Sequence, residues 1–98
     1  MSEIDKTYNV DVNDSAKLIM LEHITFLSQV SVTAAEKLYE SFEKAFDSLS
    51  KFPHRCPVFE TPYTVLEYRR LVVDRYALLF IIDEQRNIVY VEYIWDLR

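Results

Sequence analysis

The chain contains no glycine, and this absence limits both its turns and its chemistry. In 98 residues of ordinary composition, about seven glycines would be expected. Dinucleotide-binding turns, Walker phosphate loops and EF-hand calcium loops need glycine where the backbone bends sharply or approaches the ligand. These sites are therefore excluded. A turn residue with a left-handed backbone must be Asp or Asn, and we expect Asn87 to take this conformation.

The length and composition predict a single domain over residues 1–98. Half of the residues are hydrophobic, yet no apolar run approaches the roughly 20 residues of a membrane span. The polar segment 1–6 lacks the apolar stretch of a secretory leader. Cys56 is the only cysteine, so we expect a cytoplasmic protein in which this thiol is a small buried side chain. His23, His54 and Cys56 are too scattered for a metal site, and we expect neither metal nor cofactor.

The net charge of −5 is unevenly distributed. Residues 1–50 carry nine acids and four lysines, whereas residues 51–98 carry seven charges of each sign. The second half contains all six arginines: Arg55, Arg69, Arg70, Arg75, Arg86 and Arg98. Because phosphate contacts need Lys and Arg, the overall charge argues against a broadly cationic surface for nucleic acid. It still allows a small arginine-lined site in the second half.

A strand and an apolar helix are predicted at the start of the chain. Residues 7–12 have a period of two, which puts three apolar side chains on one face: Tyr8, Val10 and Val12. The residues Asn13-Asp14-Ser15 have the chemistry of a helix N-cap, and a helix is expected over 16–29. Its apolar stripe has helical spacing: Ala16, Ile19, Met20, His23, Ile24 and Leu27. Three further apolar residues widen this stripe and predict burial on more than one side: Leu18, Leu21 and Phe26.

A second, strongly amphipathic helix follows after a short connection, which predicts an antiparallel hairpin. Thr33 and Glu36 match a capping box, in which hydroxyl and carboxylate each bond the other's backbone amide. The predicted buried face steps by three and four residues: Ala35, Leu38, Phe42, Ala45 and Leu49. Pro53 and Pro57 end the helix and begin a loop that continues through Pro62.

Three strands are predicted in the second half, over 68–73, 76–82 and 88–95. The middle strand is apolar on both faces, so it should lie at the centre of the sheet. The order of elements predicts an α+β fold: a strand, a helical hairpin and a three-stranded antiparallel meander (β-α-α-β-β-β). The hairpin is expected on one face of a mostly antiparallel sheet.

Motifs in the second half occur together in one group of small proteins. The helical hairpin is followed by F-P-x-x-x-P at 52–57, by R-x-L-x-V-x-x-Y at 69–76 and by two hydrophobic strands. In this order the features resemble the RelE/ParE superfamily of small bacterial toxins, a group associated with plasmid stabilisation. The resemblance implies a RelE/ParE-like fold and the toxin half of a type II toxin–antitoxin module, neutralised by a cognate antitoxin protein. Among these toxins, RelE-like proteins cut messenger RNA on the ribosome and ParE-like proteins inhibit DNA gyrase.

The resemblance also points to candidate site residues. Arg69 and Arg70 match basic strand positions of the RelE-like nucleases, and Arg98 is a further cation near the end of the sequence. The arginine that often follows the strand tyrosine in those nucleases is replaced here, since Tyr76 precedes Ala77. The Tyr or His near the C-terminus of the nucleases also has no counterpart before the sequence ends. We therefore expect a ParE-like toxin that binds a macromolecular target, with gyrase as the candidate, through Arg69, Arg70, Arg75 and Tyr76.

Two other functions stay open. The first is a ribosome-dependent mRNA endonuclease, for which Arg69, Arg70 and Arg98 are the catalytic candidates. The second is a module that has lost toxicity and only holds its antitoxin. In each case we expect the antitoxin to contact the arginine-bearing half, because the acidic outer face of residues 36–47 would repel an acidic partner.

Structural roles compete with these functional ones. Adjacent residues of a strand face opposite sides of a sheet, so Arg69 and Arg70 cannot both face one ligand. A purely structural Arg69 would pair with Glu67 or Asp96. The aromatic residues Tyr76 and Trp95 are expected to pack rather than to stack on bases, and His23 is expected to be a hydrogen-bonded core histidine.

Overall fold

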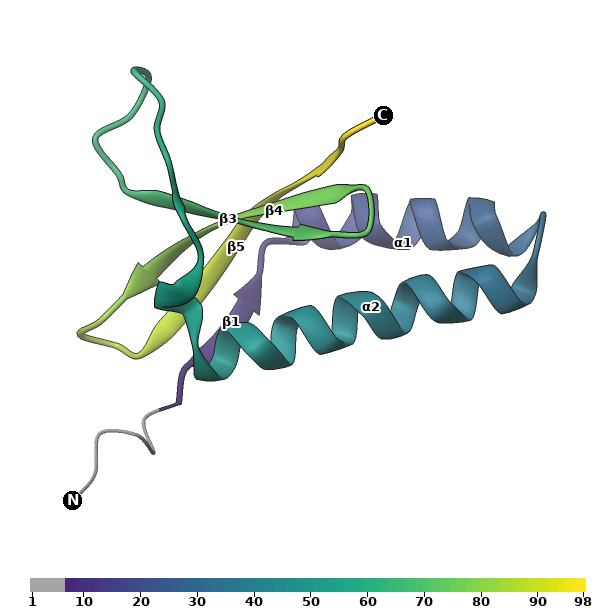
Figure 1. Ribbon diagram of the computed structural model, residues 1–98, viewed down its shortest axis with the longest axis horizontal. Helices are drawn as coiled ribbons and strands as arrows, with labels where there is room; N and C mark the ends of the chain where they lie inside the picture. Colours follow the sequence, from purple (N-terminus) through teal and green to yellow (C-terminus); the bar gives the residue numbers. More distant parts are fainter. Residues whose placement is uncertain (1–6) are drawn as a thin grey trace.

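The computed structural model describes residues 7–98, and the polar segment 1–6 lies outside the described residues. The described part has the predicted α+β fold, in which an antiparallel helical hairpin covers one face of a mostly antiparallel five-stranded sheet (Figure 1). Its elements, in chain order, are β1 (Asn9–Val12), α1 (Asp14–Ser28), α2 (Val32–Lys51), the 3-10 turn η2 (Pro53–Arg55), β2 (Val58–Phe59), β3 (Tyr68–Val73), β4 (Tyr76–Asp83) and β5 (Ile88–Asp96).

The strands lie in the order β1-β5-β4-β3-β2, so the apolar strand β4 is central, as predicted. Strand β1 pairs in parallel with β5, and the other neighbours are antiparallel. Leu79 pairs with Tyr93 but Phe80 pairs with Val91, so Glu92 is an extra residue that makes a bulge in β5.

Strand β2 was expected to be loop, and that prediction is wrong. Val58 and Phe59 pair with Arg69 and Tyr68 at the edge of the sheet. A strand of two residues directly after Pro57 is too short to show a period in the sequence. Residues 58–59 are therefore a strand only because they pair with β3. The backbone amide of Arg70 also donates to the carbonyl of Pro57 at 3.0 Å.

Two residues of the segment 7–98 have left-handed backbones, both in hairpin turns. Asn87 has a φ of 57°, as predicted, and Asp74 has a φ of 53°. Short polar side chains tolerate this region better than other non-glycine residues do. They allow the β3–β4 and β4–β5 turns to form in a chain without glycine.

Helix α2 begins one residue after Ser31, not at a capping box formed by Thr33. The Ser31 hydroxyl accepts a hydrogen bond from the amide of Ala34 at 3.1 Å, which makes Ser31 the N-cap. Ser31 is extended and its own amide donates to the carbonyl of Leu27, so the end of α1 fixes the start of α2. Thr33 consequently lies inside the first turn. The predicted buried face of α2 is confirmed in full: Ala35, Leu38, Phe42, Ala45 and Leu49.

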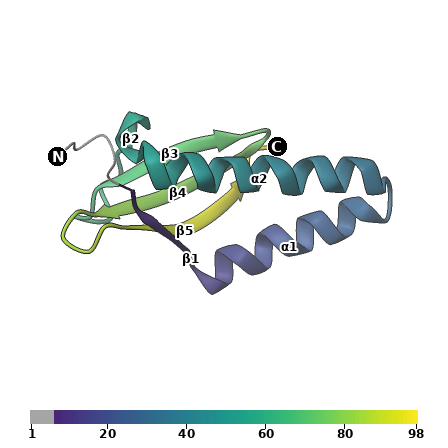
Figure 2. The same ribbon diagram turned by 90° about the horizontal axis from the view of Figure 1, so that it is seen from below.

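Helix α1 begins after the predicted N-cap Asn13, but it is buried on one side only. Ala16 and Met20 are buried, whereas Leu18 is 58% and Phe26 is 68% exposed. The predicted burial on more than one side is therefore wrong. The hairpin extends beyond the sheet toward the α1–α2 connection (Figure 2), and no other element of the described chain covers the outer side of α1.

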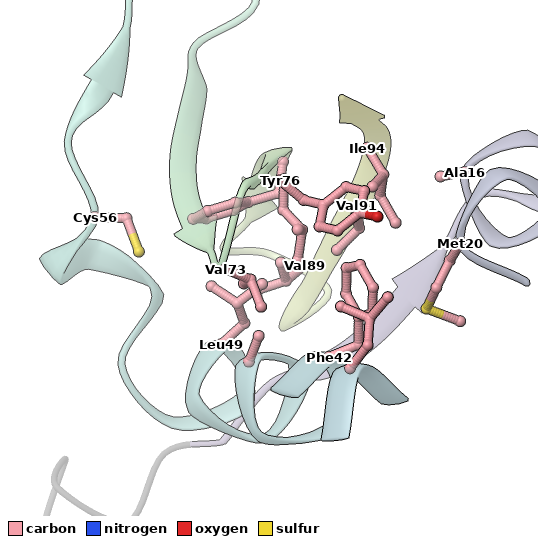
Figure 3. Packing of buried hydrophobic residues seen from close by; sticks show 14 of the residues in the cluster. Ala16, Met20, Phe42, Leu49, Cys56, Val73, Tyr76, Val89, Val91 and Ile94 are labelled. Carbon is pink, nitrogen blue, oxygen red and sulfur yellow. The ribbon is translucent and has the colours of Figure 1, made fainter. Parts of the chain in front are cut away.

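The core lies between the hairpin and the helix-facing side of the sheet (Figure 3). Phe42 and Leu49 point from α2 toward Tyr76, Val89 and Val91 on β4 and β5. Cys56 is buried at the edge of this cluster, as predicted. Its burial raises the pKa of the thiol, partly offset by the nearby cations of Arg55 and Arg69. Within the described residues, the opposite face of the sheet carries no helix, and we call it the open face.

Candidate functional site

Arg69 lies on the helix-facing side of β3, opposite the core residue Phe80. Its guanidinium donates to the carbonyls of Cys56 at 2.6 Å and His54 at 3.2 Å. The guanidinium also lies 3.6 Å from the Glu67 carboxylate. Glu67 is one of the two acids expected to pair with a purely structural Arg69. The Arg69 side chain is only 18% exposed. Arg69 therefore fastens the segment after α2 to the edge of the sheet.

Arg70 lies on the open face, as the alternation of a strand requires. It is exposed and pairs across the sheet with Leu79 of β4. Within residues 7–98, its guanidinium has neither a hydrogen bond nor an ion pair to the protein. Arg70 is thus available to a ligand, whereas its neighbour Arg69 is already bound.

Tyr76 and Arg98 lie where β4 begins and just after β5 ends, whereas Arg70 pairs with Leu79 further along β4. Tyr76 is buried, and its hydroxyl shares a hydrogen bond of 3.1 Å with His23 Nδ1. His23 is hydrogen-bonded as expected, but it lies at the rim of the core and not inside it. The Arg98 guanidinium binds both carboxylate oxygens of Asp96, with Nε at 3.2 and 3.0 Å. This contact lowers the pKa of Asp96 to about 2.

Arg75 occupies the exposed β3–β4 turn, where its carbonyl accepts a hydrogen bond of 2.7 Å from the amide of Leu97. It is five residues along the chain from Arg70. The predicted site residues are therefore divided among three places: the core side of β3, its open face, and the far end of the β3–β4 hairpin. Of the arginines named as catalytic candidates, Arg69 and Arg98 already bind other groups of the protein.

An aromatic pocket on the open face was not predicted from the sequence. Tyr93 and Trp95 come from β5, Tyr68 comes from β3, and Phe59 reaches over from β2. Their rings meet with centroid distances of 5.7 Å for Phe59–Trp95, 6.1 Å for Tyr68–Tyr93 and 6.3 Å for Tyr93–Trp95. The pocket has a volume of about 420 Å³, and its remaining lining residues are Thr61, Tyr63, Thr64 and Leu79.

The pocket is held in place by a hydrogen bond at its base. The Tyr68 hydroxyl donates to Glu92 Oε1 at 2.7 Å, and this bond, together with burial, raises the pKa of Tyr68. The phenol therefore stays protonated and acts as an anchor. Glu92 reaches it from the bulge in β5. Above this base, Tyr93 and Trp95 are 48% and 44% exposed.

Tyr93 and Trp95 are the sequence signal that could have revealed this pocket. They are two residues apart on one strand, so they share a face, and register places Arg70 in the same row as Tyr93. Trp95 packs against Phe59, as a packing aromatic should, yet nearly half of it remains accessible. Phe59 could not be recognised from the sequence as part of this pocket, because its position depends on the unpredicted strand β2.

The open face has the composition of a protein interface. Tyrosine, tryptophan and arginine are the residues that most often carry binding energy. Here tyrosines and a tryptophan line the pocket, and Arg70 pairs with its lining residue Leu79. Among residues 7–98, no three metal-ligating side chains lie close enough together to hold an ion. In the same range, no helix is both long and apolar enough to cross a membrane.

Comparison with known proteins identifies the family. Residues 10–97 match the family model described as ParE toxin of the type II toxin–antitoxin system, parDE. Curated proteins give no match. Among solved structures, the chain is similar to one in the crystal structure of the archaeal RelE–RelB complex from Pyrococcus horikoshii OT3. The TM-score is 0.62 at 15% sequence identity, over 93% of this chain and 96% of that one.

The family match covers nearly the whole described chain, and the structural match has the same fold. The chain therefore belongs to the ParE toxin family within the RelE/ParE superfamily, as the sequence motifs indicated. It is a toxin of the type II toxin–antitoxin class.

Proposed function

We propose that this toxin inhibits growth by binding a macromolecular target through the open face of its sheet, in the ParE manner, with DNA gyrase as the target. The observation that carries this proposal is the exposure of Tyr93 and Trp95 in the lining of the aromatic pocket, with the exposed Arg70 next to the lining residue Leu79 on the same face. A preformed pocket with rigid aromatic walls loses little conformational entropy when a partner side chain enters it. The match to the ParE family supports the choice of gyrase.

A ribosome-dependent endonuclease is the second candidate, and one observation favours it. The free Arg70 beside accessible aromatic rings resembles a surface on which single-stranded RNA stacks its bases. The acid–base groups on this face support binding over catalysis. Tyr68 holds its proton in the bond to Glu92, and both histidines lie elsewhere in the fold. General acid–base catalysis is most effective when the pKa of the catalytic group lies near the operating pH.

Purified toxin distinguishes the two activities. We expect micromolar toxin to block supercoiling by gyrase and the Trp95→Ala variant to block it much less, while translation in a cell-free extract continues. Unaffected supercoiling would refute the gyrase target. Cleavage of messenger RNA at mapped codons that depends on Arg70 would establish the endonuclease instead.

We further propose that a cognate antitoxin covers the arginine-bearing sheet half and keeps the toxin inactive in the cytoplasm. The archaeal relative is itself described as a complex of RelE with RelB, which supports a bound partner protein. An acidic segment would find Arg70 and Arg75 accessible on this side, but four carboxylates on the outer side of α2: Glu36, Glu40, Glu43 and Asp47. A complex in which the antitoxin mainly covers residues 36–47 would contradict this placement.

Induction tests whether the chain is still toxic. We expect growth to stop when it is produced alone and to continue when a short neighbouring reading frame, if it encodes the antitoxin, is produced with it. Unimpaired growth together with tight co-purification would instead establish a module that only holds its antitoxin.

A further inference from the structure

The aromatic pocket on the open face lies between the sheet and the loop that joins β2 to β3. The strands β3, β4 and β5 supply one side, which we call the sheet wall: Tyr68, Leu79, Tyr93 and Trp95. The other side, the loop wall, comes from the end of β2 and from the loop: Phe59, Thr61, Tyr63 and Thr64. The loop stands out from the sheet just before β3 (Figure 1), so a ligand in the pocket would be held from two sides.

The loop wall has hydroxyl groups that can donate to a ligand. The backbone amide of Tyr63 donates to Thr61 Oγ1 at 3.3 Å. The backbone amide of Leu66 donates in the same way to Thr64 Oγ1 at 3.0 Å. A hydroxyl that accepts a hydrogen bond still has its own proton to donate. A peptide segment would offer backbone carbonyls to both threonines, which a purely apolar ligand would not.

The rings of the pocket favour an aromatic side chain as the group that enters it. The planes of Phe59 and Trp95 meet at 78°, and those of Tyr68 and Tyr93 at 49°. Aromatic rings prefer such edge-to-face and tilted arrangements, so a further ring can pack on Tyr93 and Trp95 in the same manner. Rings also attract cations, but a lysine in the pocket would bring a second positive charge next to Arg70.

Arg70 provides a cation at one side of the pocket. It pairs with the lining residue Leu79, so the two Cα atoms are about 5 Å apart. An extended segment advances about 3.3 Å per residue, so a side chain two positions from the ring lies about 7 Å further along, within reach of the long Arg70 side chain. A nucleic acid fits less well, because its phosphates would also approach Glu60 and Glu67 at the two ends of the loop.

We propose that the pocket recognises an extended segment of the target that carries an aromatic side chain and, two positions away, a carboxylate. The ring enters between the sheet wall and the loop wall, the carboxylate pairs with Arg70, and the hydroxyls of Thr61 and Thr64 bind backbone carbonyls of the segment. This inference rests on the proposed function, since it names what the target presents to the open face. It does not depend on whether the target is gyrase.

Titration of the isotope-labelled toxin with synthetic peptides, followed by NMR, tests the proposal. The probe is a nine-residue serine peptide with a central phenylalanine and an aspartate two positions away on each side. We expect saturable shifts of the Trp95 indole and of the Leu79 and Tyr93 amides. Replacing the phenylalanine by alanine should weaken binding at least fivefold. Replacing it by lysine, or replacing both aspartates by asparagine, should weaken binding at least threefold.

Matched variants of the toxin assign these preferences to residues. Arg70→Gln should bind the aspartate and asparagine peptides equally, whereas Lys17→Gln, with the same change of charge on the exposed side of α1, should keep the preference for aspartate. Tyr63→Ser should weaken binding of the probe at least threefold. Because Tyr63 is 92% exposed, this variant keeps the fold, and circular dichroism checks all three.

The outcomes separate this inference from the proposed function. Tightest binding of the lysine peptide, a preference for aspartate that survives Arg70→Gln, or stronger shifts with a single-stranded RNA of nine nucleotides would overturn the inference. So would the absence of any peptide preference in a toxin whose inhibition of supercoiling depends on Trp95. Unaffected supercoiling together with the expected peptide preferences would instead refute gyrase as the target and support the inference.

Discussion

Arg69 and Arg70 are neighbours of the same residue type, but the alternation of the strand gives them different roles. Arg69 supplies the only side-chain donors that the structure gives, within residues 7–98, to the carbonyls of His54 and Cys56. Among the same described residues, the Arg70 guanidinium has no hydrogen-bond partner. The Arg69→Met variant should lose about 2 kcal/mol in the free energy of unfolding, because hydrogen bonds from charged groups stabilise more than neutral ones. Arg70→Met should change it by less than about 0.5 kcal/mol.

Urea denaturation of the two methionine variants measures this difference. Methionine keeps the apolar stem of arginine and removes the charge and the donors, so each variant controls for the other. Equal destabilisation of both would contradict the fastening role of Arg69.

Asp96 gives the stability of the fold a defined dependence on acid. Arg98 holds the pKa of Asp96 at about 2 in the folded state, below its ordinary value of 3.8. Since the folded-state pKa is the lower one, the stabilisation is complete above about pH 4 and is lost as the pH falls toward 2. The unmodified chain should therefore be more stable than Asp96→Asn at pH 5, and this difference should disappear by pH 2.

Urea midpoints measured at intervals from pH 5 to pH 2 test this expectation. Arg98→Gln removes the main cause of the shift, so its own loss of stability should begin at a higher pH than in the unmodified chain. A difference between the unmodified chain and Asp96→Asn that persisted at pH 2 would show that the charge of Asp96 contributes nothing.

At the scale of whole elements, α2 could be predicted from the sequence and α1 only in part. The buried face of α2 follows from a clean separation of apolar and charged residues, which packing against β4 and β5 then uses. In α1, apolar residues lie all around the helix, and the sequence does not say which of them find a neighbour. That depends on how far the hairpin extends beyond the sheet (Figure 2).

The candidate site was less predictable than the fold, because it too depends on contacts between residues that are distant in the sequence. Register places Arg70 beside Leu79 and in one row with Tyr93 two strands away, and this register follows from turns and bulges that involve residues distant in the sequence. The sequence correctly indicated that Arg69 and Arg70 face opposite sides. It did not indicate that Phe59 would complete an aromatic pocket, because β2 exists only through pairing with β3.

The start of α2 can be tested as an element. Ser31→Ala should lower the free energy of unfolding by about 1 kcal/mol, because the amide of Ala34 loses its acceptor at the helix N-terminus. Thr33→Ala should change it by less than about 0.5 kcal/mol, since Thr33 is exposed and alanine has a higher helix propensity. Thermal and urea unfolding of both variants provide the comparison. A larger loss for Thr33→Ala would restore the capping box predicted from the sequence.

Residues 7–98 have several surfaces with exposed apolar side chains, and two of these surfaces compete as sites for the target. Tyr93 and Trp95 lie on the open face of the sheet, whereas Leu18 and Phe26 lie on the outer side of α1 and are more exposed. Exposure alone would therefore give α1 the greater capacity for binding. The open face differs because its rings line a pocket whose Tyr68 hydroxyl is bonded to Glu92, and because Arg70 lies next to the lining residue Leu79.

Paired double variants separate these two surfaces. Tyr93→Ala/Trp95→Ala should abolish growth inhibition and weaken target binding at least 30-fold, since the loss of even one aromatic anchor costs about 2 kcal/mol. Leu18→Ala/Phe26→Ala removes a similar apolar area from α1 and should leave both within twofold. Induced growth curves at matched protein levels measure toxicity, and circular dichroism excludes unfolding as the cause. Loss of toxicity in the α1 variant alone would move the target site from the sheet to the helices, and Arg70 and the aromatic pocket would then have no part in it.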